Sequence, residues 1–193
     1  MPLYSEKEII NGCQENNRVH QEYLYKHYYS LFLKMCARYA RSMEDAEQLL
    51  NDSFLRIFNN IHSFRQAGSF EGWMKRIVVN TCLDYLKSRQ LKNTMQVSYA
   101  ASMPEETSIE IATQAIIQLE FKELLDMIQT LPPVSKTVFN LYVFDGFSHK
   151  EIGTMLDISE STSSWHLHHA RNLLQKKLKS ASAELKQYEH KRI

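Results

Sequence analysis

The chain has 193 residues, enough for one large domain or two small ones. Its 5 glycines and 4 prolines are too few for a fold built from strands and turns, and helix-favouring residues fill most of the sequence. These features predict an all-α protein of two small helical domains, and the formal net charge of +1 does not by itself indicate a nucleic-acid binder.

The first segment, residues 1–92, is predicted to be helical. Residues 5–40 form one or two helices with a wide aromatic face, and Ser42 is the expected N-cap of the next helix. That helix shows a helical repeat of apolar residues: Ala46, Leu50, Phe54, Ile57 and Ile61. Gly68 breaks the pattern, and Ser69 is the expected cap of a third helix that continues to about Arg89.

Residues 93–112 are predicted to be a flexible linker, because periodicity fades there and a polar run surrounds Pro104. The second helical domain spans residues 113–180, followed by a tail, 181–193. Its first helix should end at Leu131-Pro132-Pro133, since proline cannot continue a helix. Ser135 is the expected N-cap of the following helix, and a turn is expected at Asp145-Gly146.

A helix-turn-helix is predicted from about Ser148 to Lys176. Ser148 and Glu151 fit a capping box for a short helix, Asp157-Ile158-Ser159 fits a tight turn, and a long helix starts at Glu160. Such motifs place the second helix in the major groove of DNA. The expected DNA contacts of this motif are Lys150, Thr162, Ser164, Trp165, His168, His169 and Arg171. The alternative is a helical hairpin with no role in DNA binding.

Charge is uneven along the chain. Residues 1–100 carry 13 basic and 10 acidic side chains, residues 101–147 carry 2 and 7, and residues 148–193 carry 8 and 5. Two mildly basic modules thus flank an acidic middle, which fits either binding of a polyanion at two places or ordinary surface charge.

Two stretches of the first module are candidate binding surfaces. Residues 64–92 interleave six basic residues with Phe64, Phe70, Trp73 and Tyr85, as in proteins that hold single-stranded nucleic acid, although the aromatic residues could equally be core. The helix Met43–Phe58 joins four acids to an apolar run wider than one core-facing stripe. It is either a docking face for a protein partner or an ordinary amphipathic core helix.

Several kinds of site are not expected. Cys13, Cys36 and Cys82 are widely spaced and form no C-x-x-C pair, so we interpret them as reduced, mostly buried thiols of a cytoplasmic protein. Of the three histidines in residues 166–169, only His166 and His169 share a helix face. No cysteine or carboxylate accompanies them, so no metal or other cofactor is expected. No signal peptide, membrane span or catalytic motif is recognisable, and an enzyme is not predicted.

The motifs taken in order resemble a bacterial sigma factor of the extracytoplasmic-function (ECF) group, the small type with only regions 2 and 4. Residues 45–56, DAEQLLNDSFLR, resemble region 2.2, and residues 69–87, SFEGWMKRIVVNTCLDYLK, resemble regions 2.3–2.4. Leu131-Pro132-Pro133, Val138-Phe139 and residues 148–153, SHKEIG, resemble region 4. The similarity covers about residues 23–90 and 121–177.

The resemblance implies a transcription initiation factor. Its partners would be core RNA polymerase, through the β′ clamp and β flap, and promoter DNA, both duplex and non-template single strand. A base flipped from the minus-10 element would occupy the loop 64–72, and region 4 would recognise the minus-35 duplex. The implied polymerase contacts are Asp45, Gln48, Leu49, Asp52 and Phe54. The implied minus-10 contacts are Arg65, Phe70, Trp73, Lys75, Arg76, Asn80, Asp84 and Lys87. An anti-sigma factor or another recruiting partner is a further family expectation.

The recognition helix departs from the family. Where many relatives have Lys or Arg, this chain has Ser164, His166 and His169, and neutral histidine binds phosphate less strongly than arginine. We therefore hypothesise a modest minus-35 affinity that falls as pH rises through the histidine range, with a second DNA-targeting partner compensating. The alternatives are a helix-turn-helix regulator that does not bind polymerase and an interaction adaptor that has lost DNA binding.

Overall fold

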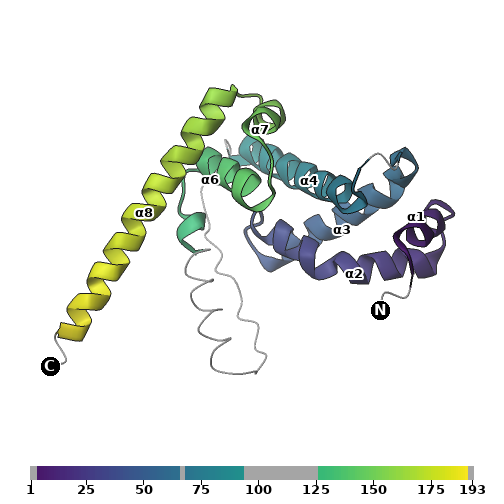
Figure 1. The fold of residues 1–193 in the computed structure, drawn as a ribbon, viewed down its shortest axis with the longest axis horizontal. Coiled ribbons are helices and arrows are strands. Elements are labelled where there is room, and N and C mark those ends of the chain that lie inside the picture. Colours follow the sequence, from purple (N-terminus) through teal and green to yellow (C-terminus); the bar gives the residue numbers. More distant parts are fainter. Residues whose placement is uncertain (1–3, 66–67, 94–125, 191–193) are drawn as a thin grey trace. The chain divides into compact units, whose positions relative to one another are not determined.

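The computed structural model describes residues 4–65, 68–93 and 126–190, and these residues are helical, with turns and short connections and without a strand (Figure 1). The fold class is thus all-α, as predicted. The chain divides into two compact units, Met1–Glu106 and Thr107–Ile193. The division falls within the predicted linker, 93–112, almost all of which lies outside the described residues, so the predicted domain bounds stay predictions.

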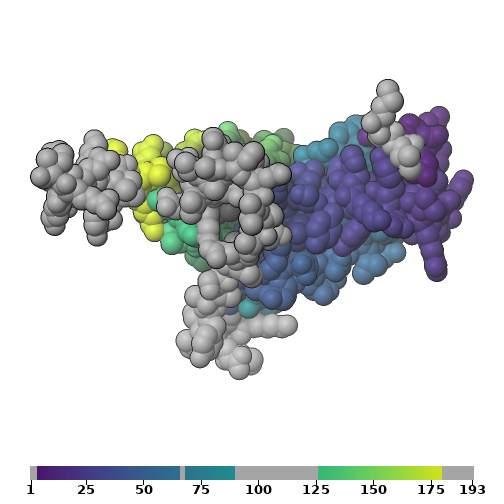
Figure 2. All heavy atoms as spheres, turned by 90° about the horizontal axis from the view of Figure 1, so that it is seen from below, coloured from purple at the N-terminus to yellow at the C-terminus, as the bar shows by residue number. Residues whose placement is uncertain are grey.

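The N-terminal unit is built from four α-helices in its described residues. They are α1 (Glu6–Gln14), α2 (Arg18–Ala37), α3 (Met43–Asn60) and α4 (Phe70–Asn93), with a short 3-10 turn, η1 (Ile61–Ser63), after α3. Helices α2, α3 and α4 pack against one another, and α1 packs on α2 (Figure 1). On the face shown in Figure 2 the atoms of α1 and α2 form a continuous surface.

The predicted caps and core of this unit are confirmed. The Ser42 side chain accepts a hydrogen bond from the Asp45 backbone N–H at 3.1 Å, and Ser69 accepts one from the Gly72 N–H at 3.2 Å. The apolar repeat predicted for α3 is buried, with residues 46, 50, 57 and 61 inaccessible to solvent. The three cysteines are free and buried, and burial raises the pKa of the Cys13 thiol to about 11.

The C-terminal unit contains α6 (Pro133–Phe139), α7 (His149–Leu156) and α8 (Glu160–His190), with a π-helical turn, η2 (Asn140–Phe144), directly after α6. Both α6 and α7 pack against α8. The predicted turn at Asp145-Gly146 is present, and Gly146 adopts a φ of 77°. This π-helical turn was not foreseen, because nothing in the local sequence distinguishes it from an α-helix.

The start of α6 differs from the sequence prediction. The prediction that Ser135 caps α6 is wrong, because Pro132 is the N-cap and Ser135 lies inside the helix, 1% exposed. The helix before Leu131-Pro132-Pro133 is described only from residue 126, and its other predicted members lie outside the described residues. Among the described helices, none combines the length and apolar character needed to cross a bilayer.

Candidate nucleic-acid interface

A narrow exposed stripe runs along α4. The side of this long helix that packs into the unit includes the fully buried residues Met74, Val78, Val79 and Cys82. The residues left at the surface on one side recur at spacings of three and four, which places them on one helix face. We call this set the α4 stripe: Trp73, Arg76, Asn80, Asp84 and Lys87.

The α4 stripe contains five of the eight residues predicted to contact minus-10 DNA, and the other three, Arg65, Phe70 and Lys75, lie outside it. Lys75 lies on a different side of α4, where its Nζ pairs with Glu71 at 2.5 Å. Phe70 is 1% exposed and belongs to the core. Its burial argues against the predicted direct contact with DNA. Asp84 is on the stripe, but its carboxylate pairs with Arg56 of α3 at 2.7 Å.

An aromatic cluster lies beside the start of the α4 stripe. The rings of Phe64, Phe70 and Trp73 lie within 5.1–5.7 Å of one another, and Phe70 and Trp73 are stacked with planes 13° apart. Phe64 and Phe70 are buried, whereas Trp73 keeps a partly exposed edge. Arg65, the eighth predicted minus-10 contact, is exposed directly after Phe64. The buried rings thus fix Trp73 where the connection from η1 to α4 meets the stripe.

The outer face of α3 differs from the sequence prediction. Leu49 and Phe54 are 4% and 2% exposed, and Phe54 packs against the rings of Tyr25 and Phe32. Both are core residues, which contradicts their assignment as surface contacts for polymerase. The apolar residue at the surface is Leu55, 61% exposed, which the prediction passed over.

Leu55 shares its side of α3 with polar residues. At spacings of three and four, the exposed side chains are Glu44, Glu47, Gln48, Asn51 and Leu55, which we call the α3 outer face. Gln48 donates a hydrogen bond to Asp52 at 2.9 Å, so these two predicted polymerase contacts are linked to each other. The spacing of residues 44, 48, 51 and 55 could have identified the α3 outer face from the sequence, because these positions lie on the helix face opposite the apolar repeat.

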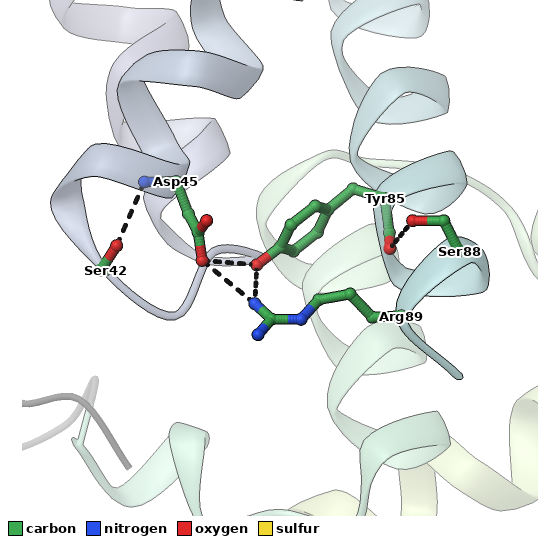
Figure 3. A network of polar contacts seen from close by, with 5 residues as sticks. All are labelled: Ser42, Asp45, Tyr85, Ser88 and Arg89. Carbon is green, nitrogen blue, oxygen red and sulfur yellow. Dashed lines mark hydrogen bonds and ion pairs between the residues drawn. The ribbon is translucent and has the colours of Figure 1, made fainter. Parts of the chain in front are cut away.

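Asp45, the remaining predicted polymerase contact, is part of a network that joins α3 to α4. Its carboxylate accepts a hydrogen bond from the Tyr85 hydroxyl at 2.7 Å and pairs with Arg89 at 3.1 Å, and Arg89 also donates to Tyr85 (Figure 3). Partial burial, followed by the hydrogen bond to Asp45, raises the pKa of Tyr85 and keeps it a donor. Asp45 therefore fixes the second half of α4 against the start of α3.

The helix-turn-helix has the predicted caps. Ser148 and Glu151 form a complete capping box at α7. Asp157 ends α7 in the left-handed conformation, with φ 56° and ψ 48°. The Ser159 Oγ accepts a hydrogen bond from the Thr162 backbone N–H at 3.0 Å. A Cβ added at Gly153 would lie 2.7 Å from the Ile158 carbonyl oxygen, so the turn closes tightly on this position.

The predicted contacts of the recognition helix are mostly exposed. Ser164 and His168 are exposed, Trp165 is 58% exposed, and Thr162 and His169 are half-buried. Lys150 is exposed on α7, and the Arg171 guanidinium lies 5.9 Å from the centre of the Tyr142 ring. Leu167, Ala170 and Leu174 of the same helix are buried. The helix thus separates its two faces as the sequence indicated.

Two serine–histidine hydrogen bonds fix the recognition helix, and neither could be predicted from a local sequence pattern. His149 of α7 contacts the buried Ser163 hydroxyl at 3.0 Å, and His166 contacts the Ser135 hydroxyl of α6 at 3.0 Å. Partial burial, and secondarily the neighbouring His169, lower the pKa of His166. His166 is therefore a structural residue of the unit rather than a cation for DNA.

The two surfaces coincide with two family models. The model for sigma-70 region 2 matches residues 24–92, and the model for sigma-70 region 4 matches residues 121–174. The chain belongs to the sigma-70 family. It is a transcription initiation factor of the ECF sigma type, whose members bind core RNA polymerase and promoter DNA.

Relatives with this description occur in distant bacteria. The chain is 28% identical over 157 residues to ECF RNA polymerase sigma factor SigE of Mycolicibacterium smegmatis, covering 80% of this chain but only 60% of that protein. It is 26% identical to SigW of Bacillus subtilis, covering 76% and 82% of the two chains. It is 23% identical to the sigma-E factor of Haemophilus influenzae, covering 90% and 95%.

Solved structures show the same fold. The chain superposes on sigma factor RpoE, solved with the anti-sigma factor NepR from Bartonella quintana, with a TM-score of 0.56 and 16% identity over 82% of this chain and 96% of RpoE. CnrH, solved in complex with the cytosolic domain of CnrY, matches with a TM-score of 0.54 and 16% identity over 91% and 97%.

Proposed function

We propose that the chain divides the work of initiation among three surfaces. The α3 outer face docks on the clamp of core polymerase, the α4 stripe and the adjoining aromatic cluster hold the opened minus-10 strand, and α8 binds the minus-35 duplex. The chain acts in the cytoplasm, by binding alone, without a cofactor or a catalytic step. The observation that carries the proposal is the α4 stripe, which places four exposed polar side chains and the partly exposed Trp73 on one helix face.

The α4 stripe suits single-stranded DNA for two physical reasons. Arg76 and Lys87 supply positive charge along a line that a phosphate backbone could follow, and Asn80 between them offers both a donor and an acceptor to a base. Trp73, fixed by buried rings, offers an aromatic edge near the loop that the family uses for a flipped base. Asp84 and Asp45 position α4 through Arg56 and Arg89 rather than contacting DNA.

The α3 outer face suits a protein partner better than DNA. Glu44 and Glu47 would repel phosphate, whereas Leu55 adds exposed apolar area among polar groups that can accept or donate hydrogen bonds. This assignment moves the docking contact from the buried Leu49 and Phe54 to Leu55. By analogy with RpoE, an anti-sigma factor is a candidate competitor for the same surfaces.

Reconstituted transcription tests the proposal. Full-length chain is added to sigma-free core polymerase with fragments of the genome that encodes it, and initiation sites are mapped. Wild type should give discrete start sites. Leu55→Asp should lose polymerase binding, while the matched control Val19→Asp, also at an exposed apolar residue of this unit, should retain it. The double variant Arg76→Gln, Lys87→Gln should bind polymerase but open promoters poorly.

The contrary outcomes are equally clear. Absence of specific initiation together with specific duplex binding would support a regulator instead of a sigma factor. Polymerase binding by Leu55→Asp at the wild-type level would remove the α3 outer face from the proposal while leaving the α4 stripe in place.

The pH hypothesis now concerns His168, which is exposed on α8, and His169, which is half-buried. A protonated imidazole attracts phosphate more strongly than a neutral one, so minus-35 affinity should fall as pH rises. Footprinting of the upstream element at two pH values tests this, with equal protection at both counting against it. Strong, selective transcription with core polymerase alone would argue against a compensating DNA-targeting partner.

A further inference from the structure

The start of the recognition helix, residues 160–168, exposes a surface without lysine or arginine. Ser161, Ser164, Trp165 and His168 are exposed and recur at spacings of three and four, so they share the side of α8 that a major groove would meet. Glu160 at the start of the helix is also exposed, and its carboxylate can only accept hydrogen bonds. None of these five side chains is the guanidinium or ammonium group that most often recognises guanine.

The cations of this helix lie too far along it to replace them. Arg171 comes six residues after Trp165, roughly 9 Å along the helix axis, and its guanidinium lies over the Tyr142 ring. Lys177 is further still and donates a hydrogen bond to Thr130 at 2.5 Å. These positions suit contacts with the DNA backbone where the helix leaves the groove, rather than with base edges.

Trp165 is the largest side chain of this surface, and it is held in place. Its indole stacks on the His169 ring with centroids 5.0 Å apart and planes 7° apart. The His166 ring meets it edge-on at 4.9 Å, and His166 is itself anchored to Ser135 of α6. The indole is therefore supported from two sides while 58% of the residue stays exposed, which presents a preorganised apolar plate.

Given the proposed function, we infer that this chain recognises an upstream duplex by packing the Trp165 indole against thymine 5-methyl groups. Thymine is the one base that presents an apolar group in the major groove, and an apolar side chain is its natural partner. Ser161 and Ser164 can hydrogen-bond to any base edge, so they add little discrimination. The element selected should thus be rich in A·T pairs at the positions under the start of α8, with thymine on the strand that faces Trp165.

Substitution of thymine by deoxyuridine tests this directly, because it removes only the 5-methyl group and keeps the base pair. The preferred upstream duplex is first selected from a randomised promoter library by core polymerase carrying the full-length chain. Each upstream thymine is then replaced in turn, and affinity is measured by competition. Wild type should lose about fourfold for each thymine methyl that it buries.

The variants separate recognition from general binding. Trp165→Ala should bind thymine and deoxyuridine duplexes equally. Leu178→Ala, at another exposed apolar residue of α8 but beyond the groove, should discriminate as wild type does. His169→Ala should weaken discrimination, because the indole loses its stacked support.

Three results would overturn the inference. They are equal wild-type affinity for both duplexes at every upstream position, a selected element dominated by G·C pairs there, or unchanged discrimination by Trp165→Ala. In each case polymerase binding and the selected minus-10 element would persist, so the proposed function would stand. If neither a polymerase complex nor an enriched sequence forms, the proposed function fails and the inference fails with it.

Discussion

The two units hold their DNA-facing helices by different chemistry. In the N-terminal unit, α4 is fixed to α3 by charged groups, through Arg56 to Asp84 and Arg89 to Asp45. In the C-terminal unit, α8 is linked to α6 and α7 by hydrogen bonds between serine and histidine side chains. The exposed surfaces differ too, since the α4 stripe carries Arg76 and Lys87, whereas residues 160–170 at the start of α8 include no lysine or arginine.

This difference teaches how the binding free energy is divided. Contacts with phosphates are strong, dependent on salt and indifferent to sequence, whereas apolar contacts with base edges are weaker and selective. The N-terminal unit should therefore supply most of the electrostatic affinity for promoter DNA. The C-terminal unit should contribute mainly selectivity, which is consistent with a recognition helix less basic than in many relatives.

The largest expected effect is a loss of stability on replacing a core residue of α3, compared with a surface residue next to it. Phe54→Ala should lower the free energy of unfolding by about 3–5 kcal/mol, because it leaves a cavity among Tyr25, Phe32 and Phe58. Leu55→Ala should change stability by less than about 0.5 kcal/mol while weakening polymerase binding. Urea unfolding and a polymerase pull-down measure the two effects. A stable Phe54→Ala protein would contradict the core assignment.

The next effect concerns the turn of the helix-turn-helix. Gly153→Val should destabilise the C-terminal unit by about 2–3 kcal/mol, because its side chain would meet the Ile158 carbonyl oxygen. The control Thr154→Val changes an exposed neighbour and should be nearly neutral. Thermal unfolding and upstream footprinting check both variants. Wild-type protection by Gly153→Val would mean that the turn yields easily.

A smaller effect is expected from the network at Asp45. Asp45→Asn should cost about 0.5–1 kcal/mol, since the carboxylate that pairs with Arg89 is partly exposed. A double-mutant cycle with Arg89→Gln isolates the coupling. If Asp45 instead contacts polymerase directly, Asp45→Asn should weaken polymerase binding equally in the presence and absence of the Arg89 change.

His166 should make the stability of the C-terminal unit depend on pH. Because burial lowers the pKa of His166 below its ordinary value near 6.5, the unfolded chain binds more protons than the folded unit between the two values. This contribution to stability is complete above the ordinary value and is lost as pH falls through the lowered one. His166→Gln should flatten the pH profile of stability below about pH 6.5, as thermal unfolding at several pH values would show.

Local signals in the sequence proved reliable where the physics is local. The caps at Ser42, Ser148 and Ser159 depend only on residues within one helical turn, and each predicted cap is present. Phe54 was predicted to be a surface contact, yet it is buried and its neighbour Leu55 is exposed, because which of two adjacent apolar residues is buried depends on the helices that pack against α3. The bond from His166 to Ser135 joins residues 31 apart, and no short motif marks it.

The salt dependence of promoter affinity tests the division between the two units most directly. Affinity of core polymerase carrying the full-length chain is measured against salt concentration at a pH where histidine is neutral. Lys87→Gln should reduce the log–log slope by about 1, while Trp165→Ala should leave the slope unchanged and remove sequence selectivity upstream. An unchanged slope with Lys87→Gln, together with a reduced slope on removing Trp165, would contradict the account.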